Sequence, residues 1–344
     1  MGEHPNISED AARADLLQLI LGFQVSQAIH AAAALGIANL LISGRKPIAD
    51  LALATGTHPD SLYRLMRALA SIRVFHEDEG RSFSLTAVGH FLRSDVADSC
   101  APMAELMGRP TSWQAWGDLL YAVRTNVPAF NHVHGRGVWE HRALHPEDGE
   151  VFDRAMAVRT EQFAVALLKA CDFGRFVHVV DVGGGDGTLL AKIVAAHPRI
   201  RATLFDQPQV VARAQLSHAS LGPSSRYQGV AGDFFVNVPE DGDAYLLKWI
   251  LHDWDDTASV DILRTCRRAM KPGSSLLVVE HIIGPANTSP RGKFMDLNML
   301  VMTGGRERTH KEFESLFDRA GLRLQSVTPT STLLSVIEGT LGEA

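Results

Sequence analysis

Residues 181–187 read Asp-Val-Gly-Gly-Gly-Asp-Gly, between an apolar run at 177–182 and a helical pattern that begins at Thr188. Closely spaced glycines let the main chain turn sharply after a strand and approach a ligand closely. The dinucleotide pattern Gly-x-Gly-x-x-Gly is not met, because its last glycine would fall on Thr188 when counted from Gly183. The stretch instead fits Asp-x-Gly-x-Gly-x-Gly, whose acidic residue suits a cationic or hydroxyl-bearing ligand better than a pyrophosphate.

Strands and helices alternate around this turn and on its C-terminal side. Continuous apolar runs predict strands that are buried on both faces, and their alternation with helices is typical of a doubly wound, mainly parallel α/β sheet of the Rossmann-like type. The predicted strands span 177–182, 201–205, 226–230, 244–250, 275–281, 322–327 and 333–338, and the predicted helices span 188–196, 208–219, 257–270 and 311–320.

The N-terminal part of the chain is predicted to be helical and to end in a small β-ribbon. Gly22 and Gly36 divide the first helical pattern into more than one helix, and the segment 28–34 is apolar on all sides, so it requires partner helices. Two helices followed by a β-wing are typical of a winged helix. The predicted elements are helices within 11–41, at 48–54 and at 61–72, and a hairpin at 74–85.

Composition and charge exclude several classes of protein. The 344 residues are 46% hydrophobic and 21% charged, as in globular proteins, and the length indicates two or three domains. The net charge of −6 provides no basic field for nucleic acid or anionic lipid. Cys100, Cys171 and Cys266 are odd in number and far apart, which argues against a disulfide framework or a cysteine zinc site.

The N-terminus does not resemble a targeting segment. Residues 1–15 carry four acidic side chains and no apolar core, and the longest apolar run, at 29–42, is interrupted and too short to span a bilayer. The histidines show no metal-ligand spacing. We therefore expect a cytoplasmic protein without a membrane segment, a nucleic-acid partner or a metal.

Acidic and aromatic residues follow the next predicted strands. Asp206 comes 19 residues after Gly187, where a carboxylate can accept both hydroxyls of a ribose. Gly232-Asp233-Phe234-Phe235 follows the third strand, and an acid beside an aromatic ring can bind and stack on an amino-purine. Lys248-Trp249-Ile250-Leu251-His252-Asp253-Trp254 follows the fourth. These segments share the carboxyl edge, where open α/β sheets bind ligands.

Five motifs, in order, carry a resemblance to a known family. They are Val-Asp-Val-Gly-Gly-Gly-x-Gly from 180, Phe-Asp-x-Pro from 205, Gly-Asp-Phe-Phe from 232, Lys-Trp-Ile-x-His-Asp-Trp from 248 and Gly-Gly-x-Glu-Arg-Thr from 304. The chain resembles the S-adenosylmethionine-dependent O-methyltransferases of the dimeric caffeate, hydroxyindole and polyketide type. The resemblance covers nearly the whole chain, because that family also carries an N-terminal winged-helix dimerisation domain.

The resemblance implies a homodimer that methylates a small aromatic hydroxyl compound and releases S-adenosylhomocysteine. It also implies three segments: a winged-helix dimerisation domain at 1–100, a helical connecting and substrate-binding segment at 101–171, and an S-adenosylmethionine-binding methyltransferase domain at 172–344. Six residues match positions that contact the cofactor in the family: Gly183, Asp206, Gly232, Asp233, Phe234 and Lys248. Gly183 would lie against the methionine part, Asp206 would hold the ribose, and Asp233 with Phe234 would hold the adenine.

The same comparison of motifs implies a catalytic base and the acids around it. His252 matches the base, and Glu280 and Glu307 match the two acids that flank it. Three further residues are expected to contact the acceptor: Met156 and Met299, which would clamp an aromatic ring between thioethers, and Asp253 beside the base.

Chemistry explains why these residue types are needed. Methyl transfer from a sulfonium is an in-line displacement, so the enzyme chiefly aligns oxygen, methyl and sulfur. A phenol with a pKa of ~10 is a poor nucleophile at neutral pH, so a base must take its proton during attack. A histidine suits this role when a carboxylate holds its second nitrogen. We expect that either Glu280 or Glu307 can hold His252 and that each partly covers for the other.

Two other functions stay open from the sequence. A relative of this family that keeps the cofactor site but catalyses decarboxylation or hydroxylation needs no base, so the presence of His252, Glu280 and Glu307 argues against it. A winged-helix DNA-binding regulator would use the helix at 61–72, but its few arginines form a thin phosphate footprint on an acidic chain. The sequence does not identify the acceptor, the hydroxyl that is methylated, or whether a nitrogen or carboxyl group takes the methyl instead.

Overall fold

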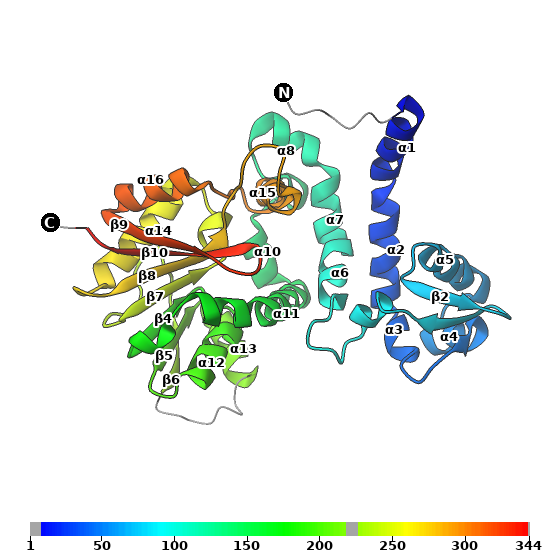
Figure 1. Cartoon of the computed structure of the whole chain (residues 1–344), viewed down its shortest axis with the longest axis horizontal. Helices are drawn as coiled ribbons and strands as arrows, with labels where there is room; N and C mark the ends of the chain where they lie inside the picture. The colour runs from blue at the N-terminus through cyan, green and yellow to red at the C-terminus, as the bar shows by residue number, and fades with distance from the viewer. Residues whose placement is uncertain (1–7, 218–225, 343–344) are drawn as a thin grey trace. The chain divides into compact units, whose positions relative to one another are not determined.

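The computed structural model describes residues 8–217 and 226–342, and the chain divides into two compact units, Met1–Trp113 and Gln114–Ala344 (Figure 1). The division falls inside the segment 101–171, which the sequence analysis treats as a connection.

The first unit contains the winged-helix elements that the sequence predicts. Helices α4 and α5 precede a β-hairpin, and a short strand completes a sheet in the order β1-β3-β2. The first helical pattern breaks at Leu21 and at Gly36, whose φ of 64° is left-handed, as the two glycines indicate. The elements are α1 (Glu9–Ile20), α2 (Gly22–Ala34), α3 (Ile37–Leu40), β1 (Lys46–Pro47), α4 (Ile48–Thr55), α5 (Pro59–Ser71), β2 (Phe75–Asp78), β3 (Ser82–Leu85), a 3₁₀ turn (Gly89–Leu92) and α6 (Ala101–Gly108).

Helices α1 and α2 carry large apolar side chains that the described residues of the first unit leave exposed. No residue of α1 is buried, and Leu19 is 78% exposed. By length and composition alone, Glu9–Ala34 would suffice to cross a membrane, and no other stretch of the described residues meets that criterion. The sequence expectation considered only the run at 29–42 and missed this longer one, because polar residues interrupt it.

The second unit is built on a seven-stranded sheet in the order β6-β5-β4-β7-β8-β10-β9. The five strands β4 to β8 are parallel, and β10 pairs antiparallel with both β8 and β9, which confirms the mainly parallel sheet. The strands are β4 (His178–Val182), β5 (Arg201–Asp206), β6 (Tyr227–Ala231), β7 (Ala244–Lys248), β8 (Ser275–His281), β9 (Leu322–Pro329) and β10 (Leu334–Leu341).

Helices cover both faces of this sheet, and alternate strand residues supply two core clusters (Figure 1). On β4, for example, Val180 and Val182 belong to one cluster and Val179 to the other. The helices that supply these two clusters are α11 (Pro146–Ala170), α12 (Thr188–Ala196), α13 (Pro208–Ser217), α14 (Asp256–Ala269) and α16 (His310–Ala320). A separate cluster joins α7 (Pro110–Gly117, across the division between the units), α8 (Leu119–Thr125), α9 (Ala129–His134), α10 (Val138–Leu144) and α15 (Pro290–Met302).

Helices α13 and α15 show how far the sequence predicted the helices of the second unit. Helix α13 begins where predicted, while the predicted end at 218–219 lies outside the described residues. Helix α15 is missing from the sequence analysis, because its apolar residues do not gather on one face and so give no clear helical period. It matters for the site, since it carries Met299.

The glycine turn after β4 has the geometry that its sequence requires. Gly183, Gly185 and Gly187 have φ values of 71°, 62° and 81°, which are left-handed and unfavourable for other residues. A Cβ atom on Gly183 would also lie 2.4 Å from Cδ1 of Ile250. The turn therefore holds the start of α12 close to the carboxyl ends of the strands.

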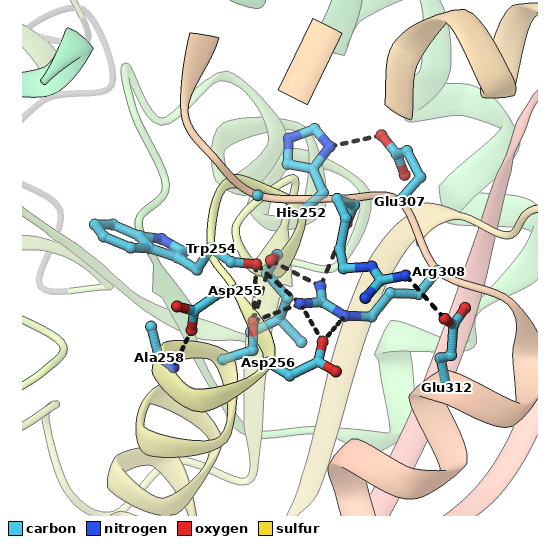
Figure 2. A network of polar contacts seen from close by, with 12 residues as sticks. His252, Trp254, Asp255, Asp256, Ala258, Glu307, Arg308 and Glu312 are labelled. Carbon is cyan, nitrogen blue, oxygen red and sulfur yellow. Dashed lines mark hydrogen bonds and ion pairs between the residues drawn. The ribbon is translucent and has the colours of Figure 1, made fainter. Parts of the chain in front are cut away.

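A buried arginine joins two loops at that edge (Figure 2). Arg308 is fully buried and donates hydrogen bonds to the carbonyl oxygens of Leu251, at 2.9 Å, and Trp254, at 2.8 Å. Its Nε also donates to Asp256 at 3.0 Å. A Cβ atom on Gly305 would lie 2.0 Å from the carbonyl oxygen of His252, so the loop at 303–309 packs directly on the turn at 249–255.

We predict that Arg308→Met lowers the free energy of unfolding by about 3–5 kcal/mol, because it leaves buried acceptors without a donor. Urea-induced unfolding of the whole protein measures the effect. Arg306→Met is the matched control: this side chain is exposed and pairs with Glu312 at 3.2 Å, so its loss should cost less than about 1 kcal/mol. Equal effects of the two substitutions would contradict the prediction.

Candidate active site

The parallel strands bring the predicted site residues to one edge of the second unit. Strands β5, β4, β7 and β8 are consecutive neighbours, and Asp206, Gly183, Lys248 and Glu280 lie at or next to their carboxyl ends. The turn with His252 follows β7, and the loop with Glu307 lies against it.

His252 lies on the 3₁₀ turn Leu251–Asp253 and is 7% exposed. Its Nδ1 is 2.8 Å from Oε1 of Glu307, and the two side chains point toward each other in Figure 2. Since a carboxylate can only accept, Nδ1 carries the proton and Nε2 keeps the lone pair when the ring is neutral. Nε2 is 3.8 Å from Oδ1 of Asp253. The free lone pair therefore lies on the side of Asp253.

Glu280 has a different role from the one expected. Its Oε1 accepts the main-chain N–H of His252 at 3.1 Å, whereas the imidazole bonds to Glu307. Glu307 therefore holds the ring here, while Glu280, near the end of β8, holds the backbone of the turn, and the expectation that each can cover for the other stays a prediction. The second oxygens of Glu280 and Glu307 are buried without a hydrogen-bond partner.

The acids determine the charge of His252. Burial disfavours the imidazolium, but Asp253, Glu307 and Glu280 together outweigh burial and raise the pKa of His252 to about 9. Burial also raises the pKa of Glu280 to about 7 and that of Asp253 to about 6. A pKa of about 9 means that the ring is mostly protonated at neutral pH.

Asp206 and the 232–235 segment lie beside the glycine turn. The two oxygens of Asp206 accept main-chain N–H groups of Gly185, at 2.9 Å, and Gln207, at 2.7 Å. Each oxygen keeps a lone pair for a further donor. Burial raises the pKa of Asp206 to about 6. Asp233 accepts the N–H of Phe235 at 2.9 Å, and a Cβ atom on Gly232 would lie 2.5 Å from the Phe205 ring.

The ring of Phe234 belongs to a small aromatic group. Its centroid lies 5.0 Å from that of Phe235 and 6.1 Å from that of Trp254, and Cε1 of Phe234 approaches the Cα side of Gly183. The structure thus brings Phe234 and Gly183 together.

Lys248 and Asp181 form a buried pair of charges next to that turn. Nζ of Lys248 donates to Oγ1 of Thr160 at 2.8 Å, and burial lowers its pKa, while burial raises the pKa of Asp181. Oδ2 of Asp181 is buried and has no hydrogen-bond partner. An acid with a free oxygen at the glycine turn fits a cationic ligand, so the residues present suit a sulfonium compound with an ammonium group.

Hydrogen bonds connect the helices of the two predicted acceptor-binding methionines to other residues of the site. Met156 lies on α11, one turn before Thr160, whose hydroxyl donates to the Met156 carbonyl oxygen at 2.7 Å. Met299 lies on α15, is 6% exposed, and follows Asp296, which accepts the main-chain N–H of Glu307 at 2.9 Å.

Sequence reasoning related Asp181, the acid of the glycine turn, to a cationic or hydroxyl-bearing ligand, but it missed Thr160, Asp296 and Arg308. Arg308 stands inside a quoted motif, so that motif did contain a signal for it. Thr160 and Asp296 lie on helices far along the chain, and only the fold brings them here. Among residues 8–217 and 226–342, no group of three or more histidines, cysteines and acids could hold a metal ion.

Comparisons with known proteins identify the family. An O-methyltransferase dimerisation domain matches residues 17–95, and an O-methyltransferase domain matches residues 116–323. The phenazine O-methyltransferase PhzM of Lysobacter antibioticus is 44% identical over 323 residues, which are 94% of this chain and 94% of that protein.

Solved structures agree with the sequence comparisons. The crystal structure of LaPhzM superposes with a TM-score of 0.93 at 43% identity and covers 96% of this chain and 99% of that one. NcsB1, an O-methyltransferase of neocarzinostatin biosynthesis solved with S-adenosylmethionine and 2-hydroxy-5-methyl naphthoic acid, has a TM-score of 0.81 at 32% identity, with 92% and 96% covered. The chain belongs to the O-methyltransferases that carry a dimerisation domain and use S-adenosylmethionine as the methyl donor.

Proposed function

We propose that this enzyme methylates a phenolic hydroxyl of a small aromatic natural product, with His252 as the general base. The supporting observation is the 2.8 Å hydrogen bond from Nδ1 of His252 to Glu307, which leaves Nε2 to accept a proton. PhzM is named for a phenazine, and NcsB1 was solved with a hydroxylated naphthoic acid, so aromatic acceptors suit this family. An enzyme that catalyses decarboxylation or hydroxylation needs no general base, so the presence of the hydrogen-bonded pair His252–Glu307 favours methyl transfer.

The chain's own residues position and deprotonate the acceptor in this proposal. Glu307 fixes the ring of His252, and Glu280 fixes its main chain, so Nε2 points in one direction. Met156 and Met299 hold the aromatic ring, and Asp253 stabilises the imidazolium after the proton arrives. S-adenosylmethionine supplies the methyl group from its sulfonium. Alignment by these residues is the larger part of catalysis, because the displacement needs no further acid or base.

The proposed cofactor contacts are those of the motifs. Asp206 would accept the ribose hydroxyls, Asp233 and Phe234 would hold the adenine, and Gly183 and Lys248 would lie near the methionine part. Gly232 allows the chain to pass the Phe205 ring. In this reading residues 101–171 connect the two domains and supply acceptor contacts such as Met156.

The exposed apolar surface of α1 and α2 suggests how the enzyme is assembled. It lies largely within the segment that matches the dimerisation domain, and several large apolar side chains there are about half exposed or more. We infer that a second copy of the chain covers it in a homodimer. This assembly accounts for the apolar stretch Glu9–Ala34 without a membrane.

We predict that Asp206→Ala weakens S-adenosylmethionine binding roughly 10- to 100-fold, because charge-assisted hydrogen bonds to the ribose are lost. Isothermal titration calorimetry measures the affinity. Since the pKa of Asp206 is about 6, affinity of the parent should fall as the pH drops below that value and the carboxylate becomes protonated. The exposed acid Asp261 on α14 supplies the control substitution Asp261→Ala. An unchanged affinity in Asp206→Ala would rule out this contact.

We predict that His252→Gln lowers kcat roughly 10²- to 10⁴-fold and leaves cofactor affinity nearly unchanged. The exposed His58 provides the control His58→Gln, which should retain full activity. Labelled S-adenosylmethionine and location of the methyl group show whether oxygen is the acceptor. Parental activity in His252→Gln on an ordinary phenol would leave alignment alone as the source of catalysis.

The same base should appear in the pH dependence. Below its pKa of about 9 the His252 ring is protonated and cannot accept a proton, so kcat/KM of the parent should fall as the pH decreases through that value. Glu307→Gln removes a charge that favours the imidazolium, so the acid limb should move to lower pH while kcat decreases. A limb that stays in place in Glu307→Gln would contradict the assignment.

We predict a homodimer by light scattering at micromolar concentration. Leu19→Glu places a charge on the exposed surface of α1 and should produce monomers, because a charge without a partner is costly in an apolar interface. Val236→Glu is the control at an exposed apolar position of the second unit. A monodisperse parental monomer would refute the proposed assembly.

A further inference from the structure

Arg142, Arg159 and Arg308 of the second unit are partly or fully buried, and they differ in what balances their charge. Arg308 is fully buried and satisfied by carbonyl oxygens and Asp256. Arg142, on α10, lies 3.6 Å from the ring centroid of Phe152, and the carboxylates of Asp253, Asp153 and Asp148 all act on it. Groups of the protein itself therefore balance the charge of both Arg308 and Arg142.

Arg159, on α11, lacks such compensation. Its guanidinium carbon lies 4.3 Å from the centroid of the Trp249 ring, and among the described residues no hydrogen bond or ion pair to it is formed. The acid that acts on its charge is Glu307, which already accepts a hydrogen bond from His252, and the other charged group that acts on it is a second cation, Arg291. The donors of this partly buried guanidinium thus have no acceptor in the described chain.

Lys248 provides an instructive contrast. It lies against the same indole, with Nζ 4.3 Å from the ring centroid, but it has Thr160 as a hydrogen-bond partner and Asp181 as a counter-charge. Of the two cations on Trp249, the lysine is therefore balanced by residues at the glycine turn. The guanidinium of Arg159 is therefore free to bind an anionic group of a ligand.

The position of Arg159 indicates which ligand carries the group that its guanidinium would bind. Arg159 stands one helical turn after Met156. The charges of Arg291 and Glu307 act on its guanidinium: Arg291 lies in the first turn of α15, the helix of Met299, and Glu307 lies in the loop after that helix. Met156 and Met299 are the residues proposed to hold the acceptor, whereas the proposed ribose and adenine contacts lie at the ends of β5 and β6. The guanidinium lies over the Trp249 ring, and its parallel N–H groups match a carboxylate in a two-pronged pair.

We propose that Arg159 binds an anionic substituent of the acceptor, so that the preferred substrates are aromatic compounds with both a hydroxyl and a carboxylate. The proposal rests on the proposed function, because it adds a second contact to the acceptor that His252 deprotonates. The other carboxylate of suitable chemistry is that of the cofactor's methionine part. The test below separates the two sources.

Binding to the enzyme loaded with S-adenosylhomocysteine tests this contact without methyl transfer. Two matched pairs serve as probes: 3-hydroxy-2-naphthoate with 3-hydroxy-2-naphthamide, and 4-hydroxybenzoate with 4-hydroxybenzamide. Calorimetry should show that the parent prefers the carboxylate in at least one pair by roughly 10- to 100-fold, as expected for a charge-assisted two-pronged pair. Arg159→Met should abolish the preference, and Arg159→Lys should restore part of it.

Two controls complete the design. Arg264→Met makes the same change in net charge at an exposed position of α14 and should keep the preference. The affinity of Arg159→Met for S-adenosylmethionine should equal that of the parent. A loss of cofactor affinity instead would assign Arg159 to the methionine carboxylate and overturn the proposal.

Other outcomes also overturn it. A carboxylate preference that survives in Arg159→Met, a parent without preference in either pair, or a parent that binds neither carboxylate would each reject an anion site at Arg159. Failure of the proposed function looks different, because His252→Gln would then retain activity on a phenol while the binding data stay as they are.

Discussion

The contact between the loop at 303–309 and the turn at 249–255 is the constraint on which the site depends. Arg308 donates to carbonyl oxygens of that turn, Gly305 leaves room for its backbone, and Glu307 reaches the ring of His252. Glu280 holds the same turn from the end of β8. A histidine that is fixed at Nδ1 and at its main chain keeps Nε2 in one direction. The proposed base therefore owes its orientation to residues outside its own turn.

The charges at this edge are arranged in pairs, and the exceptions are informative. Acids around His252 raise its pKa to about 9 despite burial, and Asp181 balances Lys248. Oxygen atoms of Asp181, Glu280 and Glu307 stay buried without a partner, and the half-buried Arg159 has donors with no acceptor among the described residues. Since buried polar groups are normally paired, unpaired ones at a family's ligand edge indicate where ligands contribute.

Sequence and fold also meet in the first unit. Its helices α4 and α5 and the hairpin after them were predicted, and the family match assigns residues 17–95 to dimerisation, not to DNA binding. What the sequence did not reveal was the extent of the uncovered apolar surface on α1 and α2. Exposure depends on which side chains other helices cover, and that is a property of packing.

The sequence alone determined the local features of this protein. Apolar runs fixed the strands, glycines with left-handed φ values fixed the turn at 183–187, and the five motifs indicated the family and the base, because all of these act over a few neighbouring residues. Helix α15 was missed since its apolar residues have no one-sided period. Only the tertiary structure decided which glutamate bonds the ring of His252, that Arg308 holds the turn, and that Arg159 has no hydrogen-bond or ion-pair partner among the described residues. Those facts depend on distances between segments that lie 50 residues or more apart, and no local pattern encodes them.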